Sequence, residues 1–189
     1  MASFVRLLVL FVPMLDFSVM AADKYQCVTA PNPPKLPVTR ASGRTHSGNW
    51  AKVVQLAGVS DTWKETRHEI GAVPAGTTVE ILEDLIVVDA PDIVWVSAPI
   101  EEMNLKQGDT ILRYAHLGEG WADLWTEGCW YKEARADFVT EPDGAGCGGS
   151  DCLAKVTKMG RQMWWFHIKL PSGKTGWTLR QSLDLSPGG

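Results

Sequence analysis

The chain has 189 residues, 45% of them hydrophobic, and a formal net charge of −4. This length and composition allow one or two compact domains with a hydrophobic core. The weak acidity argues against nucleic-acid binding, because phosphate recognition needs a basic face and a pI well above neutral.

The N-terminus has the features of an export signal. Arg6 precedes an apolar run from Leu7 to Leu15, and small residues follow in "SVMAA". The run is too short to span about 30 Å of hydrocarbon as a helix, and no other segment is apolar enough to cross a membrane. We therefore expect residues 1–21 to be a signal peptide cleaved near Ala21, no membrane span afterwards, and a periplasmic or secreted protein.

Export changes the interpretation of the cysteines. Cys27, Cys129, Cys147 and Cys152 are an even number, and disulfides persist in oxidising compartments. Three pairings are possible. Cys147 and Cys152 could close a small ring around "GGSD", which would leave Cys27 to attach the N-terminal arm to Cys129. A metal site is not expected, because no further soft ligands lie at close spacing.

Residues 22–50 are expected to form a Pro-rich arm, since the prolines of "PNPPKLP" remove backbone donors and favour extended backbone. After it, short runs rich in β-branched and aromatic residues predict strands bounded by Gly, Pro, Asp or Asn. The eight runs are 51–56, 77–82, 93–98, 110–117, 121–125, 152–158, 163–170 and 175–179. Residues 61–71 are expected to be a short helix capped by Asp61, or a loop.

Turn signals separate several of these runs. "PAGT" and "KQGDT" each place a Gly, which tolerates positive φ, just before a strand. "PSGKTGW" (171–177) predicts a hairpin connection. Eight short strands at this spacing favour small barrels or sandwiches.

Two stretches resemble bacterial SH3-like (SH3b) domains. "MWWFHIKLPSGKTGWTL" is similar to the C-terminal half of such a domain, and "LKQGDTILRYAHLGEGWADLWTEGCWYKE" (105–133) to the first module of tandem SH3-like proteins. The resemblance implies an all-β fold with two small SH3-like barrels in tandem, expected at 51–138 and 139–189. Residues 23–100 match no pattern of that family, and no catalytic domain of a cell-wall hydrolase fits the chain.

Motifs for catalysis are not evident. The chain has no HExxH, GxSxG or phosphate-cradling motif, and the adjacent carboxylates of 83–84 and 101–102 point to opposite sides of a strand. We expect no enzyme, no metal and no cofactor. A small hydrolase is the alternative, and it would need His46, His68 or His116 to meet a Ser, Cys or carboxylate in a cleft.

Aromatic residues are the remaining candidates for a binding surface. The chain has nine Trp, and six of them lie within 121–177. Trp164 and Trp165 must face opposite sides of a strand, so one can be core while the other is exposed, covered by a neighbouring module, or part of a site. The candidate binding residues are Tyr114, Trp121, Trp125, Trp164, Trp165, His167 and Trp177.

These features together predict a non-catalytic, exported SH3-like binding protein of the bacterial cell envelope. Its expected partner is peptidoglycan or an envelope protein. A second alternative is an exported inhibitor or immunity-type protein that blocks an enzyme. That alternative predicts a protruding, disulfide-braced loop such as 143–152.

Overall fold

The structure, a computed structural model, describes residues 25–41 and 50–185. The expected signal peptide, its cleavage near Ala21, and His46 lie outside these residues. The described chain is all-β, as expected, with fifteen strands and three single-turn 3-10 helices. It contains no helix long and apolar enough to cross a membrane.

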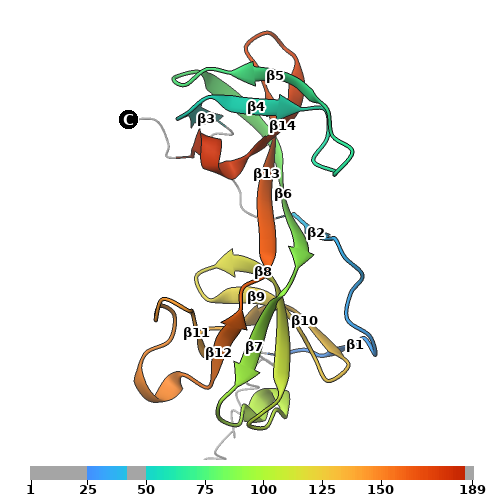
Figure 1. Ribbon diagram of the computed structural model, residues 1–189, viewed down its shortest axis with the longest axis vertical. Coiled ribbons are helices and arrows are strands. Elements are labelled where there is room, and N and C mark those ends of the chain that lie inside the picture. The colour runs from blue at the N-terminus through green and yellow to red at the C-terminus, as the bar shows by residue number, and fades with distance from the viewer. Residues whose placement is uncertain (1–24, 42–49, 186–189) are drawn as a thin grey trace, which may run out of the picture.

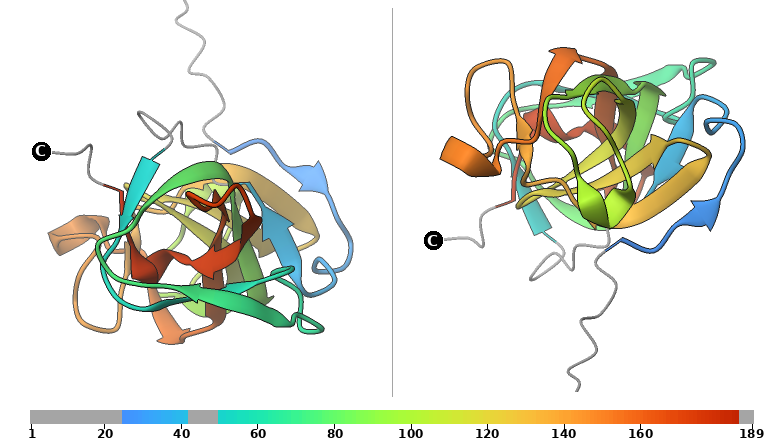
Figure 2. Two further views of the ribbon diagram at one scale, coloured as in Figure 1. Left: turned by 90° about the horizontal axis from the view of Figure 1, so that it is seen from above. Right: turned by 90° about the horizontal axis from the view of Figure 1, so that it is seen from below.

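The strands form two curled sheets, stacked along the long axis of the molecule (Figure 1). Each sheet curls into a half-barrel, which is visible when the molecule is viewed from either end (Figure 2). We call the body around the first sheet the lower lobe and the body around the second sheet the upper lobe, after their positions in Figure 1.

The lower lobe is built mainly from residues 92–158. In spatial order its strands are β1 (Val28–Thr29), β10 (Cys129–Arg135), β9 (Trp121–Thr126), β8 (Thr110–Gly118), β7 (Asp92–Val96), β12 (Ala154–Lys158) and β11 (Val139–Thr140). All neighbours are antiparallel except β11 and β12. The helices η1 (Glu101–Met103) and η2 (Gly149–Asp151) lie in its connections.

The upper lobe uses residues from both sides of that segment. In spatial order its strands are β15 (Leu183–Asp184), β3 (Trp50–Val53), β6 (Thr78–Ala90), β13 (Arg161–Lys169), β14 (Thr175–Leu179), β4 (Ala57–Ser60) and β5 (Glu69–Val73). β2 (Val38–Arg40) also pairs with β6, and η3 (Arg180–Ser182) precedes β15. Each lobe has its own apolar core, so each can exclude water independently.

Each of the eight predicted runs contains a strand, although β3 ends at Val53, short of the expected 56, and β6 runs much further than 77–82. The hairpin expected at 171–177 joins the antiparallel pair β13 and β14, and Gly173 there has φ 83°. Residues 61–68 form a loop, not a helix. Asp61 still organises it, because its Oδ1 accepts a hydrogen bond of 2.9 Å from the His68 backbone N–H.

One antiparallel ribbon passes through both lobes. β6 continues into β7, and β12 continues into β13. These two continuous segments pair with each other on either side of a short break. Pro91, which cannot donate a ladder hydrogen bond, and Gly160 lie at the break. A Cβ on Gly160 would lie 2.5 Å from the Pro91 carbonyl carbon. Only glycine therefore lets the two segments of the ribbon approach this closely.

The lower lobe is therefore inserted between the two halves of the upper lobe. The expected boundary between residues 138 and 139 falls within the lower sheet, because β12 pairs with β7. Conversely, residues 51–90, expected in the first module, share a sheet with β13 and β14.

The N-terminal arm runs along one side of both lobes (Figure 1). β1 pairs with β10 in the lower lobe and β2 pairs with β6 in the upper lobe. The arm is thus a strap between the lobes, and it is anchored in each by strand pairing.

Candidate functional site

The seven predicted binding residues do not form a single surface. Three of them lie in a third apolar cluster, which contains Ile86 and Val88 from the upper lobe and Ala115 and Trp130 from the lower lobe. Tyr114 is buried in this cluster, and Trp125 and Trp164 pack against it. These three aromatic side chains pack where the lobes meet, and Tyr114 also lines the cleft described below.

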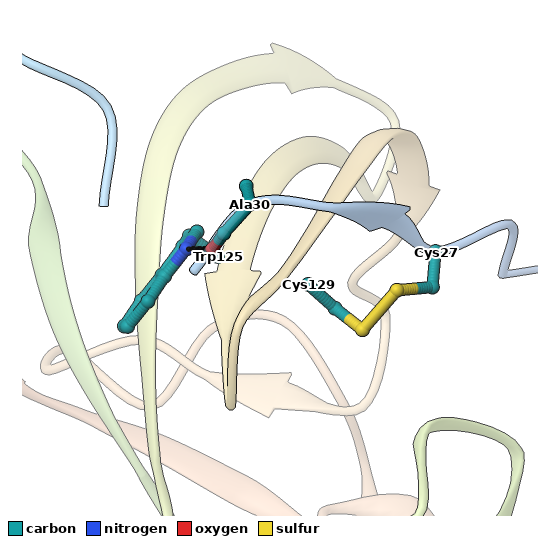
Figure 3. Close-up of a disulfide and its surroundings, with 4 residues drawn as sticks. All are labelled: Cys27, Ala30, Trp125 and Cys129. Carbon is teal, nitrogen blue, oxygen red and sulfur yellow. Dashed lines mark hydrogen bonds between the residues drawn. A yellow bond between two sulfur atoms is a disulfide. The ribbon is translucent and has the colours of Figure 1, made fainter. Parts of the chain in front are cut away.

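Two of the three tryptophans at this junction, Trp125 and Trp164, have satisfied N–H groups. Trp164 Nε1 donates to Asp84 Oδ2 at 2.7 Å. Trp125 Nε1 donates to the Ala30 carbonyl oxygen of the arm at 2.8 Å, close to the disulfide (Figure 3). A buried indole N–H normally needs such a partner, so these contacts fix the orientation of both rings.

Trp165 faces the opposite side of β13 and is also buried, with 4% of its surface exposed. The Arg67 guanidinium lies 5.3 Å from its ring centroid, a cation–π distance. Its Nε1 has no hydrogen-bond partner in the described part of the chain. The two adjacent tryptophans are therefore shielded from solvent by different parts of the chain. Trp164 packs against the lower lobe, and Arg67 of the 61–68 loop packs over Trp165.

His167 and Trp177 form a stacked pair on the upper sheet. Their ring centroids are 4.9 Å apart with an interplanar angle of 10°, and His167 Nδ1 lies 3.2 Å from Glu83 Oε1. His167 and Trp177 are directly opposite each other on β13 and β14, and this cross-strand pairing accounts for the stacking of their rings. The pair is partly exposed, but it lines none of the cavities described below.

Trp121 is the most exposed of the candidates, at 38%. It begins β9, and the Arg135 guanidinium lies 5.2 Å from its ring centroid. Trp121 lines a cavity of about 320 Å³. This cavity shares three lining residues, Arg113, His116 and Glu141, with an open cleft of about 600 Å³ where the lobes meet. We call the two together the interlobe cleft.

The interlobe cleft is formed where the ribbon crosses between lobes. Its walls come from the crossing segments 90–92 and 159–162, from β8, from residues 119–122 at the start of β9, and from residues 136–146. Gln162 Oε1 accepts a hydrogen bond of 3.2 Å from the His116 backbone N–H. The cleft therefore depends on both lobes and on their relative position.

A buried arginine organises the charges of the cleft. Arg113 is 4% exposed; its Nε donates to Asp92 Oδ2 at 2.8 Å and its Nη2 to Glu141 Oε2 at 2.9 Å. A buried charge needs this degree of pairing. The hydrogen bonds from Arg113 hold the pKa of the Glu141 carboxyl below its ordinary value. By bridging Glu141 and Asp92, Arg113 attaches the 141–152 loop to the ribbon.

Sequence reasoning missed Arg113 and Glu141. The signal was present in "TILRYAHL", where Arg113 occupies an inward position of an otherwise apolar, alternating strand. A charge at such a position requires buried partners. Glu141 gives no comparable signal, because its pairing depends on a contact with a residue 28 positions away.

One histidine, His116, is among the described residues that line the cleft. Its Nδ1 lies 4.0 Å from Glu141 Oε1, but Glu141 is already bound to Arg113 by both oxygens. No Ser, Thr or Cys is among the described residues that line the cleft. Nor does that part of the chain hold a group of three or more His, Cys, Asp or Glu able to bind a metal ion.

Both disulfides proposed from the sequence are present. Cys27 bonds to Cys129 and Cys147 bonds to Cys152. The second closes the base of an exposed loop on the opposite side of the molecule from the arm (Figures 1 and 2). The first attaches the arm next to Trp125 (Figure 3).

Comparison with known proteins adds no assignment. No protein-family model matches the chain, and no similar protein was found among curated sequences or solved structures.

Proposed function

We propose that the protein is a non-catalytic binding protein of the bacterial cell envelope, and that it binds peptidoglycan or an envelope protein in the interlobe cleft. The observation that carries this proposal is the open cleft between two lobes, with the exposed face of Trp121 at one end. Ligand sites favour such junctions, with an apolar wall and a few fixed polar groups.

Two further features support the proposal. Two disulfides fit a protein that works in an oxidising compartment. The side chains of the cleft combine an aromatic face with fixed carboxylates and with the His116 imidazole, groups that stack on rings and hydrogen-bond to hydroxyls and amides. The resemblance of residues 105–133 and 163–179 to SH3-like modules is compatible with a binding role.

Retention on purified peptidoglycan sacculi tests the proposal. The purified protein should co-sediment with sacculi at low and moderate salt, and Trp121→Ala should reduce the retained fraction at least about tenfold, as loss of a binding aromatic does. Trp50→Ala is the matched control, because Trp50 is 57% exposed but lies in the upper lobe, outside the cleft.

The outcomes separate the two partners. No retention of the wild-type protein would overturn wall binding. Chemical cross-linking in intact cells would then identify an envelope protein, and Trp121→Ala should remove that cross-link. Equal behaviour of Trp121→Ala and Trp50→Ala in both assays would refute the cleft as the binding site.

A second candidate function, inhibition of an enzyme, is favoured by the 141–152 loop. The loop is braced by Cys147–Cys152, and most of its residues are exposed. A rigid loop of this kind fits an enzyme's cleft at low entropic cost. Wall-degrading enzymes assayed on sacculi should then slow when the protein is added, and Cys147→Ser with Cys152→Ser should weaken the effect. No slowing of any enzyme would exclude this function.

A further inference from the structure

A second groove lies on the upper lobe, between the N-terminal arm and the 61–68 loop. It has a volume of about 550 Å³ and touches the interlobe cleft only at Arg161. We call it the arm groove. Nothing in the proposed function uses it.

The arm groove has an apolar interior. Val87 of β6 and Met163 of β13 are cross-strand partners and form one wall, while Leu36 and Pro37 of the arm and Trp63 of the loop complete it. Leu36 is 48% exposed. An apolar groove with an exposed leucine at its edge can bury an aliphatic or aromatic side chain of a partner.

The rim of the arm groove carries two cations that lack carboxylate partners. Lys64 and Arg67 both line the groove and are exposed, and neither forms an ion pair within the part of the chain that the structure describes. By contrast, Arg161 is paired with Asp89 at 3.0 Å. The positive charge without a carboxylate partner is thus concentrated on the loop side of the groove. Besides Asp89, Glu65 is the one carboxylate among the described residues that line the groove.

The loop is ordered by its own hydrogen bonds. The Asp61 backbone N–H donates to the His68 carbonyl at 3.0 Å, and the Arg67 N–H donates to the Lys64 carbonyl at 3.0 Å. Arg67 is further fixed by its contact with the Trp165 ring. The guanidinium is therefore held in place before any ligand arrives, which lowers the entropic cost of binding.

The arm borders the groove as backbone without strand partners. Leu36 and Pro37 line the groove, lie outside the strands and make no backbone hydrogen bond to other described residues. An extended peptide can pair its main chain with backbone of this kind.

From these observations we propose that the arm groove binds an acidic peptide segment of a partner protein. An apolar side chain of that segment enters between Trp63 and Met163, and a neighbouring carboxylate pairs with Arg67 and Lys64. Arginine held in this way recognises a carboxylate through two hydrogen bonds.

Selection from a phage library of random linear peptides tests this inference. The purified, disulfide-bonded protein is the bait, and Lys64→Glu with Arg67→Glu is selected in parallel. The wild-type protein should enrich peptides that place Asp or Glu beside Leu, Ile or Phe, whereas the double variant should not. The most enriched peptide should bind at least about tenfold more weakly to the double variant, and more weakly as salt rises.

Two controls keep the outcome decisive. Lys132→Glu reverses an exposed charge on β10 of the lower lobe and should leave binding unchanged. Lys64→Glu alone leaves the Arg67–Trp165 contact in place, so its effect on binding cannot come from misfolding around Trp165. Failure to enrich any peptide, or enrichment of the same peptides by wild type and double variant, would overturn the inference. Neither result bears on the interlobe cleft, which the Trp121→Ala variant tests separately.

Discussion

Removing the Cys27–Cys129 disulfide should cost far more stability than removing Cys147–Cys152. The two bonds close loops with sequence separations of 102 and 5 residues. In the chain-entropy treatment, the longer cross-link restricts the unfolded chain by about 4.7 kcal/mol and the shorter one by about 2 kcal/mol. The double variants Cys27→Ala/Cys129→Ala and Cys147→Ala/Cys152→Ala should lose about these amounts.

Urea unfolding under non-reducing conditions measures both losses. Tryptophan fluorescence and far-UV circular dichroism should report the same transition for each variant, which justifies a two-state free energy. The urea dependence of the free energy should also become steeper without Cys27–Cys129, because the released unfolded chain exposes more surface.

A control separates the cross-link from the contacts of the arm. Trp125→Phe keeps the disulfide but removes the hydrogen bond to the Ala30 carbonyl, and it should cost about 1 kcal/mol. Equal losses for the two cysteine variants, or a loss below about 2 kcal/mol for Cys27→Ala/Cys129→Ala, would refute the view that the long loop dominates.

Three further predictions concern the junction and the ribbon. Trp164→Ala and Trp165→Ala should each lower the free energy of unfolding by about 3–5 kcal/mol, measured by urea denaturation; a loss below about 1 kcal/mol for either would contradict its assignment as a packed residue. Arg113 lowers the Glu141 pKa in the folded state, so this pair stabilises the fold above the ordinary pKa of 4.5, and the contribution is lost as pH falls through the lowered pKa. Glu141→Gln should therefore be less stable than wild type near neutral pH, with the gap closing in acid; a gap independent of pH would refute the linkage. Gly160→Ala should cost about 1–3 kcal/mol or more through overpacking, and an unchanged thermal midpoint would show that the ribbon can separate there.

Local patterns predicted the strands well. The run "MWWFHIKL" forms a strand, although the adjacent Trp165 and Phe166 are both buried, and its pairing with "TGWTL" follows from the turn between them. The alternation of side chains along a strand predicted that Trp164 and Trp165 face opposite ways. It could not tell what covers each ring, because the covers come from the lower lobe and from Arg67, both distant in the sequence.

Long-range pairing explains what the sequence did not reveal. β6 appeared as a six-residue strand because "EDLIVVDA" begins with the two carboxylates Glu83 and Asp84, yet the residues of this stretch pair with β2 and β13 at the junction of the lobes. The insertion of one lobe into the other depends on β7 meeting β12 across more than fifty residues. No local propensity or turn residue specifies such a pairing.

The cysteine pairing was one of three possibilities, and it is the one found. The small Gly-rich ring favoured it on loop length alone. What the sequence could not show is that the Cys27–Cys129 bond anchors a strap. The strap carries Arg40, which pairs with the buried Asp123 across the junction, and burial raises the pKa of the Asp123 carboxyl.

The nested order of the two lobes has a consequence for biosynthesis. All strands of the lower lobe except β1 come from one continuous stretch, and β1 precedes that stretch in the chain. The lower lobe can therefore be complete while β13, β14 and β15 have not yet been made. Since chains fold from the N-terminus as they emerge, the first half of the upper lobe can form only two separate groups of strands, β2–β6–β3 and β4–β5. These groups are joined only when β13 and β14 arrive. A chain truncated after residue 160 should consequently keep the lower lobe and expose the edge of β6 that pairs with β13, an unpaired edge to which another chain can add.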